Sequence, residues 1–183
     1  MLLGILSDTH GNVAAASAAV ALLRSRGAER LLHCGDVGCG GVLDLLACLP
    51  AGFVFGNCDI DRAGLARYAA ALGLECYGEA GEIETDGKRI AITHGHNPRL
   101  VRAILDGQRH DYLLVGHSHI QADQQVGKVR VINPGALHRA ARLTVALLEP
   151  AANRLEFHAI GHLSPAPPRV ASGGAPGVVE SLP

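Results

Sequence analysis

The first third of the chain alternates short apolar runs with longer segments of helical character, and this alternation restricts the fold more than any other feature. The apolar runs are residues 2–6, 30–33 and 52–55, typical in length and composition of strands buried on both faces. The segments between them, 12–26 and 42–49, are predicted helices; Asn12 can cap the first, and Gly27 stands just after its end. This order predicts parallel strands, whose carboxyl ends share one edge of a sheet.

The pattern changes from about residue 79, where antiparallel pairs are predicted. Asp86-Gly87, a dipeptide that favours tight hairpin turns, separates apolar segments 83–85 and 89–93. A second hairpin is predicted around Gly127-Lys128, between 121–126 and 129–132. A helix at 98–105, a buried strand at 112–115 and two closing strands at 143–148 and 154–160 complete the prediction.

Composition indicates one folded domain and does not favour binding to a nucleic-acid polymer. Hydrophobic residues make up 48% and charged residues 18% of the 183 residues, a balance typical of a globular domain. Aromatic residues make up 3% and the formal net charge is −1, so neither base stacking nor a basic surface is favoured. We predict a domain at 1–162 and a flexible tail at 163–183, which is rich in Pro, Gly, Ala and Ser.

The cysteines and the amino-terminal segment favour a cytoplasmic protein without a membrane anchor. The five cysteines are odd in number and form no CxxC pair, which indicates reduced thiols. The apolar start lacks a basic segment, and Asp8 and His10 follow too soon for a signal peptide or a membrane span.

Polar blocks rich in metal-binding side chains follow five of the apolar runs. The blocks are Asp8-Thr9-His10, Gly35-Asp36, Gly56-Asn57-Cys58-Asp59, His94-Gly95-His96 and Gly116-His117-Ser118-His119. Each block alone is an ordinary turn sequence. Together they offer carboxylate, imidazole and carboxamide groups and no Lys or Arg, so they predict a cation site with nitrogen and oxygen ligands.

The order of these blocks resembles the calcineurin-like metallophosphoesterases, whose pattern is D-x-H, G-D, G-N-x, H and G-H-x-H. The resemblance runs from Asp8 to His119, and the short length, the Gly56-Asn57-Cys58-Asp59 block and Asn133-Pro134-Gly135 are further similar to the family's small bacterial and archaeal phosphodiesterases. It implies an α/β fold in which two mixed β-sheets pack as a sandwich flanked by helices, in four layers.

By position, the resemblance implies a site for two divalent metal ions. It assigns Asp8, His10 and His119 to one ion, Asn57, His94 and His117 to the other, and Asp36 to a bridge between them. Asp36, Asn57 and His117 are also the predicted catalytic residues. Manganese is the first expectation, with nickel, iron or zinc as alternatives, because these ligands do not select one metal.

The implied activity is hydrolysis of a small phosphate ester, a phosphodiester and in some cases a monoester, by in-line attack of a hydroxide held between the two ions. A second interpretation is a protein-binding scaffold, since the retromer subunit related to this family keeps the fold but has lost ligands; here the set is intact. Another metallohydrolase, such as an amidohydrolase or a β-lactamase-like enzyme, would need its histidine clusters in a different order.

On the substrate side of the site, Cys58 stands where many relatives have a histidine that is thought to help the leaving group depart. A thiol is the weaker hydrogen-bond donor, so turnover is predicted to be slow except for esters with good leaving groups. Arg99 and Arg139 are candidates to hold a substrate phosphate, or simply exposed cations, and no substrate-binding residue is assigned.

Four further residues in or near the blocks are not assigned as metal ligands. His96 is either a supporting donor or a solvated loop residue. Asp59 either orients a ligand histidine or caps the helix that follows, and the cap is favoured. His33 is interpreted as a core histidine and Thr9 as a spacer.

Overall fold

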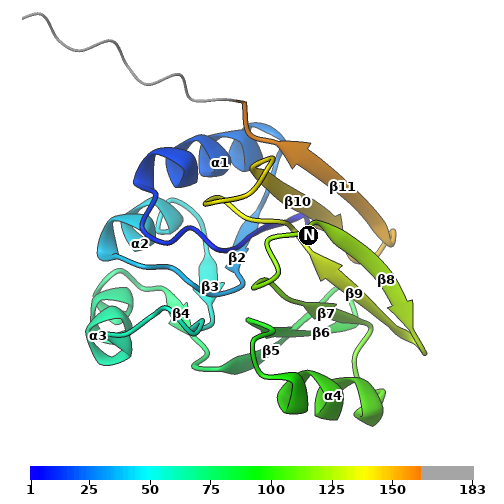
Figure 1. The fold of residues 1–183 in the computed structure, drawn as a ribbon. Coiled ribbons are helices and arrows are strands. Elements are labelled where there is room, and N and C mark those ends of the chain that lie inside the picture. The colour runs from blue at the N-terminus through cyan, green and yellow to red at the C-terminus, as the bar shows by residue number, and fades with distance from the viewer. Residues whose placement is uncertain (162–183) are drawn as a thin grey trace, which may run out of the picture.

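The computed structural model describes residues 1–161, which form two β-sheets and four helices (Figure 1). The tail predicted at 163–183 lies outside the described residues. No helix within residues 1–161 combines the length and the apolar character that a membrane crossing requires. The elements in chain order are β1 (Leu3–Leu6), α1 (Val13–Ser25), β2 (Arg30–His33), α2 (Gly40–Leu46), β3 (Ala51–Phe53), α3 (Arg62–Ala71), β4 (Glu75–Cys76), β5 (Ala80–Thr85), β6 (Lys88–Thr93), α4 (Pro98–Gly107), β7 (Tyr112–Leu114), β8 (Ala122–Val126), β9 (Val129–Asn133), β10 (Thr144–Glu149) and β11 (Arg154–Ala159).

The first sheet contains the predicted parallel strands. Its order is β11-β10-β1-β2-β3-β4, with β1 to β4 parallel and β10 antiparallel to both β1 and β11. Helices α1, α2 and α3 lie along one side of this sheet (Figure 1). The buried face of α1 is built from small and branched residues, including Ala15, Ala19 and Leu23, which pack in one core with Leu31 and Phe53 of the sheet.

The second sheet has the order β5-β6-β7-β9-β8 and is also mixed. Strands β6, β7 and β9 are parallel, while β5 and β8 form antiparallel hairpins with their neighbours. Helix α4 covers its outer face, where Val101 and Ile104 pack against Ala91 and Leu113. The sheet therefore has one helix-covered face and one face turned toward the first sheet.

Side-chain alternation explains how the sheets pack against each other. Successive residues of a strand point to opposite faces. In β1, Leu6 joins the core under the helices, while Leu3 and Ile5 join a second core that includes Ile90 and Ile92 of β6. The layers are thus α1–α3, first sheet, second sheet and α4, which confirms the predicted four-layer α/β sandwich.

The sequence predicted the turn at Asp86-Gly87 well, but it did not predict the bounds of α3 and β4. Asp86 and Gly87 have φ angles of 53° and 71°, the left-handed values that a two-residue type I′ turn requires. The bounds of α3 and β4 were not predicted from the sequence. Ala69 is the only buried residue described in α3, so its apolar stripe is narrow, and β4 has only two residues.

Candidate metal centre

All seven predicted ligands lie in loops at the carboxyl ends of parallel strands. Asp8 and His10 follow β1, Asp36 follows β2, and Asn57 follows β3 in the first sheet. His94 follows β6, and His117 and His119 follow β7 in the second sheet. The candidate site therefore spans the common edge of the two sheets, as expected for ligands of α/β folds.

The backbone at these loops is unusual, because five of the seven residues adopt left-handed conformations. The φ angles are 53° at Asp8, 45° at His10, 55° at Asp36, 67° at His117 and 58° at His119. Left-handed non-glycine residues cost about 1–2 kcal/mol each and cluster at functional sites. These turns direct side chains two residues apart toward one place, which explains the D-x-H and H-x-H spacing.

Asp8 supplies a buried carboxylate oxygen without a hydrogen bond. Its Oδ2 accepts the backbone N–H of His117 at 3.0 Å. Its Oδ1 has no hydrogen-bond partner among the described residues, yet lies 3.3 Å from His119 Nε2 and 3.9 Å from both His10 Nε2 and His94 Nε2. A buried anionic oxygen left without a donor is costly, and three surrounding ring nitrogens are the environment that a shared cation would satisfy.

Asp36 lies between imidazoles from both predicted ligand sets. Its Oδ2 is 3.3 Å from His94 Nε2 and 3.5 Å from His10 Nε2, and its Oδ1 accepts the Cys58 backbone N–H at 2.7 Å. Burial opposes ionisation of Asp36, but His94 and the Cys58 N–H outweigh it and hold the carboxyl pKa well below its usual value. Asp36 is thus an anion in the position that a bridging ligand needs.

His94 is oriented by the main chain of the first sheet. Its Nδ1 lies 2.8 Å from the Cys34 carbonyl, to which it donates, so Nε2 is left facing Asn57 Oδ1 at 3.2 Å. Burial lowers the pKa of His94, but contacts with Asp36 and the Cys34 carbonyl outweigh burial and raise it. A proton would therefore compete with a cation for Nε2 at acidic pH.

The structure groups most, but not all, of the predicted ligand atoms closely. The donor atoms of Asp8, His10 and His119 lie within 4.8 Å of one another, and so do those of Asp8, Asp36 and His94. The first group is the set predicted for one ion. The His117 ring lies 5.2 Å from the His94 ring between centroids, beside these groups. The predicted donors thus converge at one place, and their assignment as ligands remains a prediction.

Glycines in the polar blocks give the donors room. A Cβ at Gly35 would lie 2.7 Å from His94 Nδ1, and a Cβ at Gly56 would collide with the Asp36 carboxylate. Any larger residue at either position would displace one of these two donors.

Two residues that were predicted to lie outside the site hold its loops. His33 is fully buried, as predicted, and burial lowers its pKa to about 3, so it is neutral. Its Nδ1 accepts the Gly35 N–H at 3.2 Å, and its Nε2 lies 2.9 Å from Thr9 Oγ1. Thr9 is therefore more than a spacer: its hydroxyl joins the Asp8 loop to the Asp36 loop, since it also contacts the Val37 carbonyl at 2.9 Å.

The helix-cap role that was favoured for Asp59 is wrong. Asp61 caps α3 by accepting the Gly64 N–H at 2.9 Å, whereas Asp59 accepts the N–H groups of Gly38 and Gly56, each at 2.8 Å. Asp59 thereby ties the loop after β2 to the loop after β3. Asp61 was not predicted as the cap, and its hydrogen bond to the Gly64 N–H identifies it.

Further polar residues surround the cluster. The His96 ring lies 5.4 Å from the His94 ring, and the His138 ring lies 5.2 Å from the His10 ring, between centroids. Arg139 lines a pocket beside His119, whereas Arg99 is exposed in the first turn of α4. The approach of His138 to His10 depends on tertiary contact alone, so no spacing in the sequence predicts it.

Cys58 lies against the predicted ligands. Its Sγ is within 4.8 Å of the donor atoms of His10 and Asp36, and burial and the Asp36 carboxylate raise the pKa of the thiol. The side chain is exposed, so it borders both the cluster and solvent.

Comparison with known proteins agrees with this arrangement. The family model of the calcineurin-like phosphoesterase superfamily domain matches residues 1–153. Phosphodiesterase MJ0936 of Methanocaldococcus jannaschii is 29% identical over 138 residues, which cover 74% of this chain and 83% of the relative. Phosphodiesterase YfcE of Escherichia coli K12 is 26% identical over 152 residues, covering 75% and 79%. The solved structure of an archaeal phosphodiesterase superposes with a TM-score of 0.80 at 25% identity, covering 87% of this chain and 99% of that one.

Proposed function

Because this chain belongs to the calcineurin-like phosphoesterase superfamily, we propose that it is a metal-dependent phosphodiesterase that binds two divalent cations. Its similarity to two small phosphodiesterases supports the diester as substrate. Some phosphomonoesters are secondary substrates in this proposal.

One observation carries the proposal: the buried Asp8 Oδ1, unbonded among the described residues, faces the Nε2 atoms of three histidines. Carboxylate and imidazole donors of this kind suit manganese, nickel, iron or zinc. Asp8, His10 and His119 would hold one cation, Asn57, His94 and His117 the other, and Asp36 would contact both. When bound, two such cations supply the positive charge and the activated water that phosphate-ester hydrolysis needs.

The chain's own contribution is to hold these donors in place before substrate arrives. The His117 N–H fixes Asp8, the Cys58 N–H fixes Asp36, and the Cys34 carbonyl fixes the His94 ring. Such supporting hydrogen bonds set the orientation of ligands and their affinity for metal. Imidazoles near the substrate, among them His117, would stabilise charge that develops on the phosphate oxygens.

The direct test uses protein that has been stripped of metal and then supplied with one metal at a time. An aryl phosphodiester, an aryl phosphomonoester and an aryl amide are assayed side by side, with manganese as the first metal. We expect diester hydrolysis to disappear on chelation and to return with metal. Full diester hydrolysis in the chelated protein would refute the proposal.

The scaffold interpretation predicts a different result in a simpler measurement. A metal content close to zero after purification and dialysis would favour the protein-binding scaffold. We expect instead about two equivalents of metal per chain by elemental analysis, since two ligand sets are the expected requirement.

A further inference from the structure

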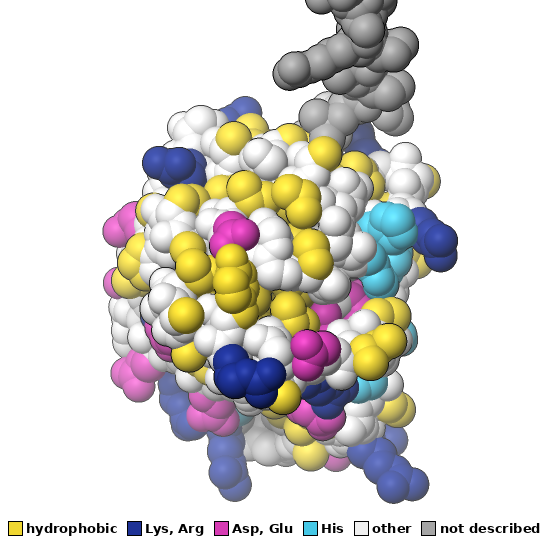
Figure 2. Space-filling model, turned by 90° about the vertical axis from the view of Figure 1, so that its left-hand side faces the viewer, with side chains coloured by type: hydrophobic (Ala, Val, Ile, Leu, Met, Phe, Trp, Pro, Cys, Tyr) yellow, Lys and Arg dark blue, Asp and Glu magenta, His cyan; other side chains and the backbone are white. Residues whose placement is uncertain are grey.

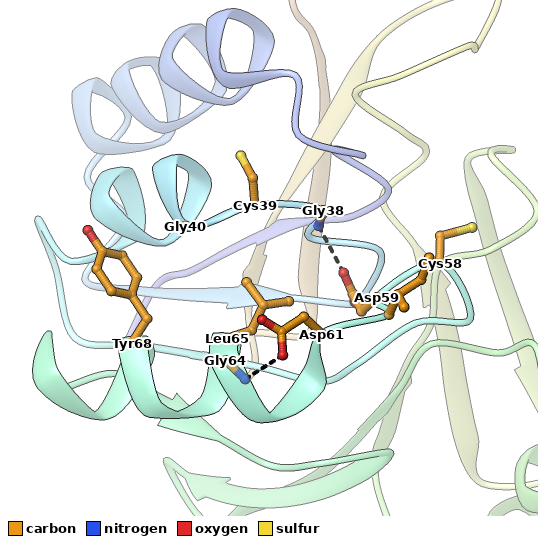
Figure 3. Close-up of a pocket in the computed structure, with 10 residues that line it drawn as sticks. Gly38, Cys39, Gly40, Cys58, Asp59, Asp61, Gly64, Leu65 and Tyr68 are labelled. Carbon is orange, nitrogen blue, oxygen red and sulfur yellow. Dashed lines mark hydrogen bonds between the residues drawn. The ribbon is translucent and has the colours of Figure 1, made fainter.

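A pocket of about 510 Å³ opens beside the donor cluster, between the start of α2 with the loop before it and α3 with the loop before it. Figure 3 shows its ten lining residues, with Cys58 and Asp59 at one end, Tyr68 at the other and Leu65 between them. Its volume falls in the range of about 300–1,000 Å³ found for small-molecule sites. We call it the α2–α3 pocket.

The α2–α3 pocket is continuous with the candidate metal centre through Cys58. The Cys58 backbone N–H donates to Asp36 Oδ1 at 2.7 Å, and its Sγ lies within 4.8 Å of the donor atoms of His10 and Asp36. A phosphate at the cluster would therefore place one of its ester groups at the mouth of this pocket.

Apart from two carboxylates, the side chains that line the α2–α3 pocket are apolar or aromatic. Figure 2 shows the molecule from the side that carries α2 and α3, and hydrophobic side chains gather across the middle of this face. Ile60, Leu65 and Tyr68 supply the largest side chains of the pocket, and the Ile60 side chain is 95% exposed. The Tyr68 ring is fixed, because its hydroxyl donates to Asp44 at 2.7 Å and its ring lies so close to Gly40 that a Cβ there would be 3.0 Å from the ring. A rigid aromatic surface next to exposed aliphatic side chains favours a flat apolar group.

The charged side chains of the lining disfavour an anionic group. Asp59 and Asp61 contribute carboxylates, and the ten lining residues include no Lys, Arg or His. Hydrogen bonds from Gly38 and Gly56 hold Asp59, and one from Gly64 holds Asp61, so neither carboxylate is free to turn away. In contrast, a second pocket of about 390 Å³ beside His119 carries Arg139 and Arg142.

From these observations we propose that the α2–α3 pocket binds an uncharged, apolar and preferably aromatic ester group of the substrate, whose phosphate lies at the donor cluster. The inference rests on the proposed phosphodiesterase function and narrows its substrate class. Phosphodiesters whose ester groups are all anionic would be poor substrates. Ile60 and Leu65 are then specificity-determining residues, since they would touch that group and none of the predicted metal ligands.

Binding of three phosphonates to zinc-loaded protein tests this assignment, because each phosphonate carries a single substituent. We expect phenylphosphonate to bind on the order of tenfold more tightly than methylphosphonate, and phosphonoacetate to bind no better than methylphosphonate. Ile60→Lys should remove most of the phenyl preference and improve phosphonoacetate binding, because it places a cation at the rim.

Val126→Lys is the matched control, since Val126 is another exposed apolar residue but lies on β8 away from both pockets. It should leave all three affinities unchanged. Equal phenyl preference in wild type, Ile60→Lys and Val126→Lys would overturn the assignment.

Methyl NMR spectra provide a readout that does not depend on catalysis. Phenylphosphonate should shift the Leu65 methyl signals and leave those of Ile120, in the second pocket, in place. Shifts at Ile120 alone would place the apolar group in the second pocket and overturn the assignment. If metal-dependent diester hydrolysis is present but the phenyl preference is absent, only the pocket assignment fails; if neither is present, the proposed function fails as well.

Discussion

Cys58 stands where many proteins of the resembled family have a histidine, whereas the other polar blocks follow the family pattern. Its thiol lies among the donors of His10 and Asp36, and its pKa is raised, so it stays protonated at neutral pH. A protonated thiol is a weak hydrogen-bond donor and gives little help to a departing alkoxide.

Cys58→His is therefore expected to raise kcat/KM for diesters of poorly acidic alcohols by roughly 10²-fold, the lower end of general-acid contributions. The side chain is exposed, so a larger imidazole has room. Diesters of p-nitrophenol, whose departure needs little help, serve as the internal control and should change much less. An unchanged rate on the poor leaving groups would contradict this account of Cys58.

His33 links the acid stability of the protein to the loops of the site. Its pKa in the folded state is lowered from 6.5 to about 3 by burial, so the unfolded chain binds a proton in this window and the folded chain does not. The contribution of neutral His33 to the free energy of unfolding is fully present above pH 6.5 and is lost as pH falls toward 3. The loss from this residue is at most about 1.4 kcal/mol per pH unit.

His33→Gln should reduce the dependence of unfolding free energy on pH between 6 and 4, although it lowers stability at neutral pH. Urea unfolding of the chelated wild type and variant at several pH values measures both effects. His158→Gln is a suitable control, because His158 lies on β11 and contacts the exposed Glu156. The same slope in wild type and His33→Gln would show that His33 does not contribute to acid unfolding.

Among the elements, the hairpin between β5 and β6 depends on the conformation of one turn. Gly87 has a φ of 71°, and a Cβ added at this residue would meet nothing within 4 Å, so the only cost of a side chain there is backbone strain. Gly87→Ala should lower the free energy of unfolding by about 1 kcal/mol.

Gly107→Ala provides the comparison, because Gly107 lies in α4 and an added Cβ would meet nothing closer than 3.9 Å. In a helix this substitution should be neutral or stabilising by about 0.5–1 kcal/mol. Urea unfolding distinguishes the two signs, and phosphodiesterase activity should be unaffected in both proteins. Equal effects of the two substitutions would contradict the turn geometry.

Residues that are neighbours in the sequence were enough to predict most helices and strands. The prediction failed where contacts between residues far apart in the sequence decide the structure. Asp86-Gly87 specifies its turn by itself. The start of α3 did not follow from sequence, because Asp59 and Asp61 can both cap a helix and a distant loop decides between them. The pairing of β1 with β10, such as Leu3 with Leu148, has no local signal and was not predicted from the sequence.

For the whole molecule, the convergence of the donors could be predicted, but the network that supports them could not. The order of the polar blocks and the edge rule for parallel strands bring seven side chains together. The Thr9 to His33 contact and the approach of His138 to His10 arise from packing of separate loops, and no spacing rule predicts them.

Metal binding should stabilise the entire fold, because the predicted ligands come from five loops of two sheets. At a metal concentration of 100 times Kd the gain is about 2.7 kcal/mol, measurable as a rise in Tm. Asp8→Asn should abolish that rise, and it should also raise the Tm of the chelated protein because it removes a buried negative charge whose Oδ1 has no hydrogen-bond partner among the described residues. Asp123→Asn, which alters an exposed pair with Arg130, is the control that should retain the rise with metal. A rise of wild-type size in Asp8→Asn would argue against metal binding at this site.

Because the candidate metal centre lies at the junction of the two sheets, the proposed hydrolysis would be sensitive to a part of the interior that does not contact substrate. Ile5 of one sheet and Ile92 of the other pack together beneath loops that carry opposite halves of the ligand set. A small loss of volume there, as in Ile92→Val, would alter the packing that sets the two halves of the predicted ligand set against each other. Under the proposed function, turnover would then change before the melting temperature does, although none of the predicted ligands is altered.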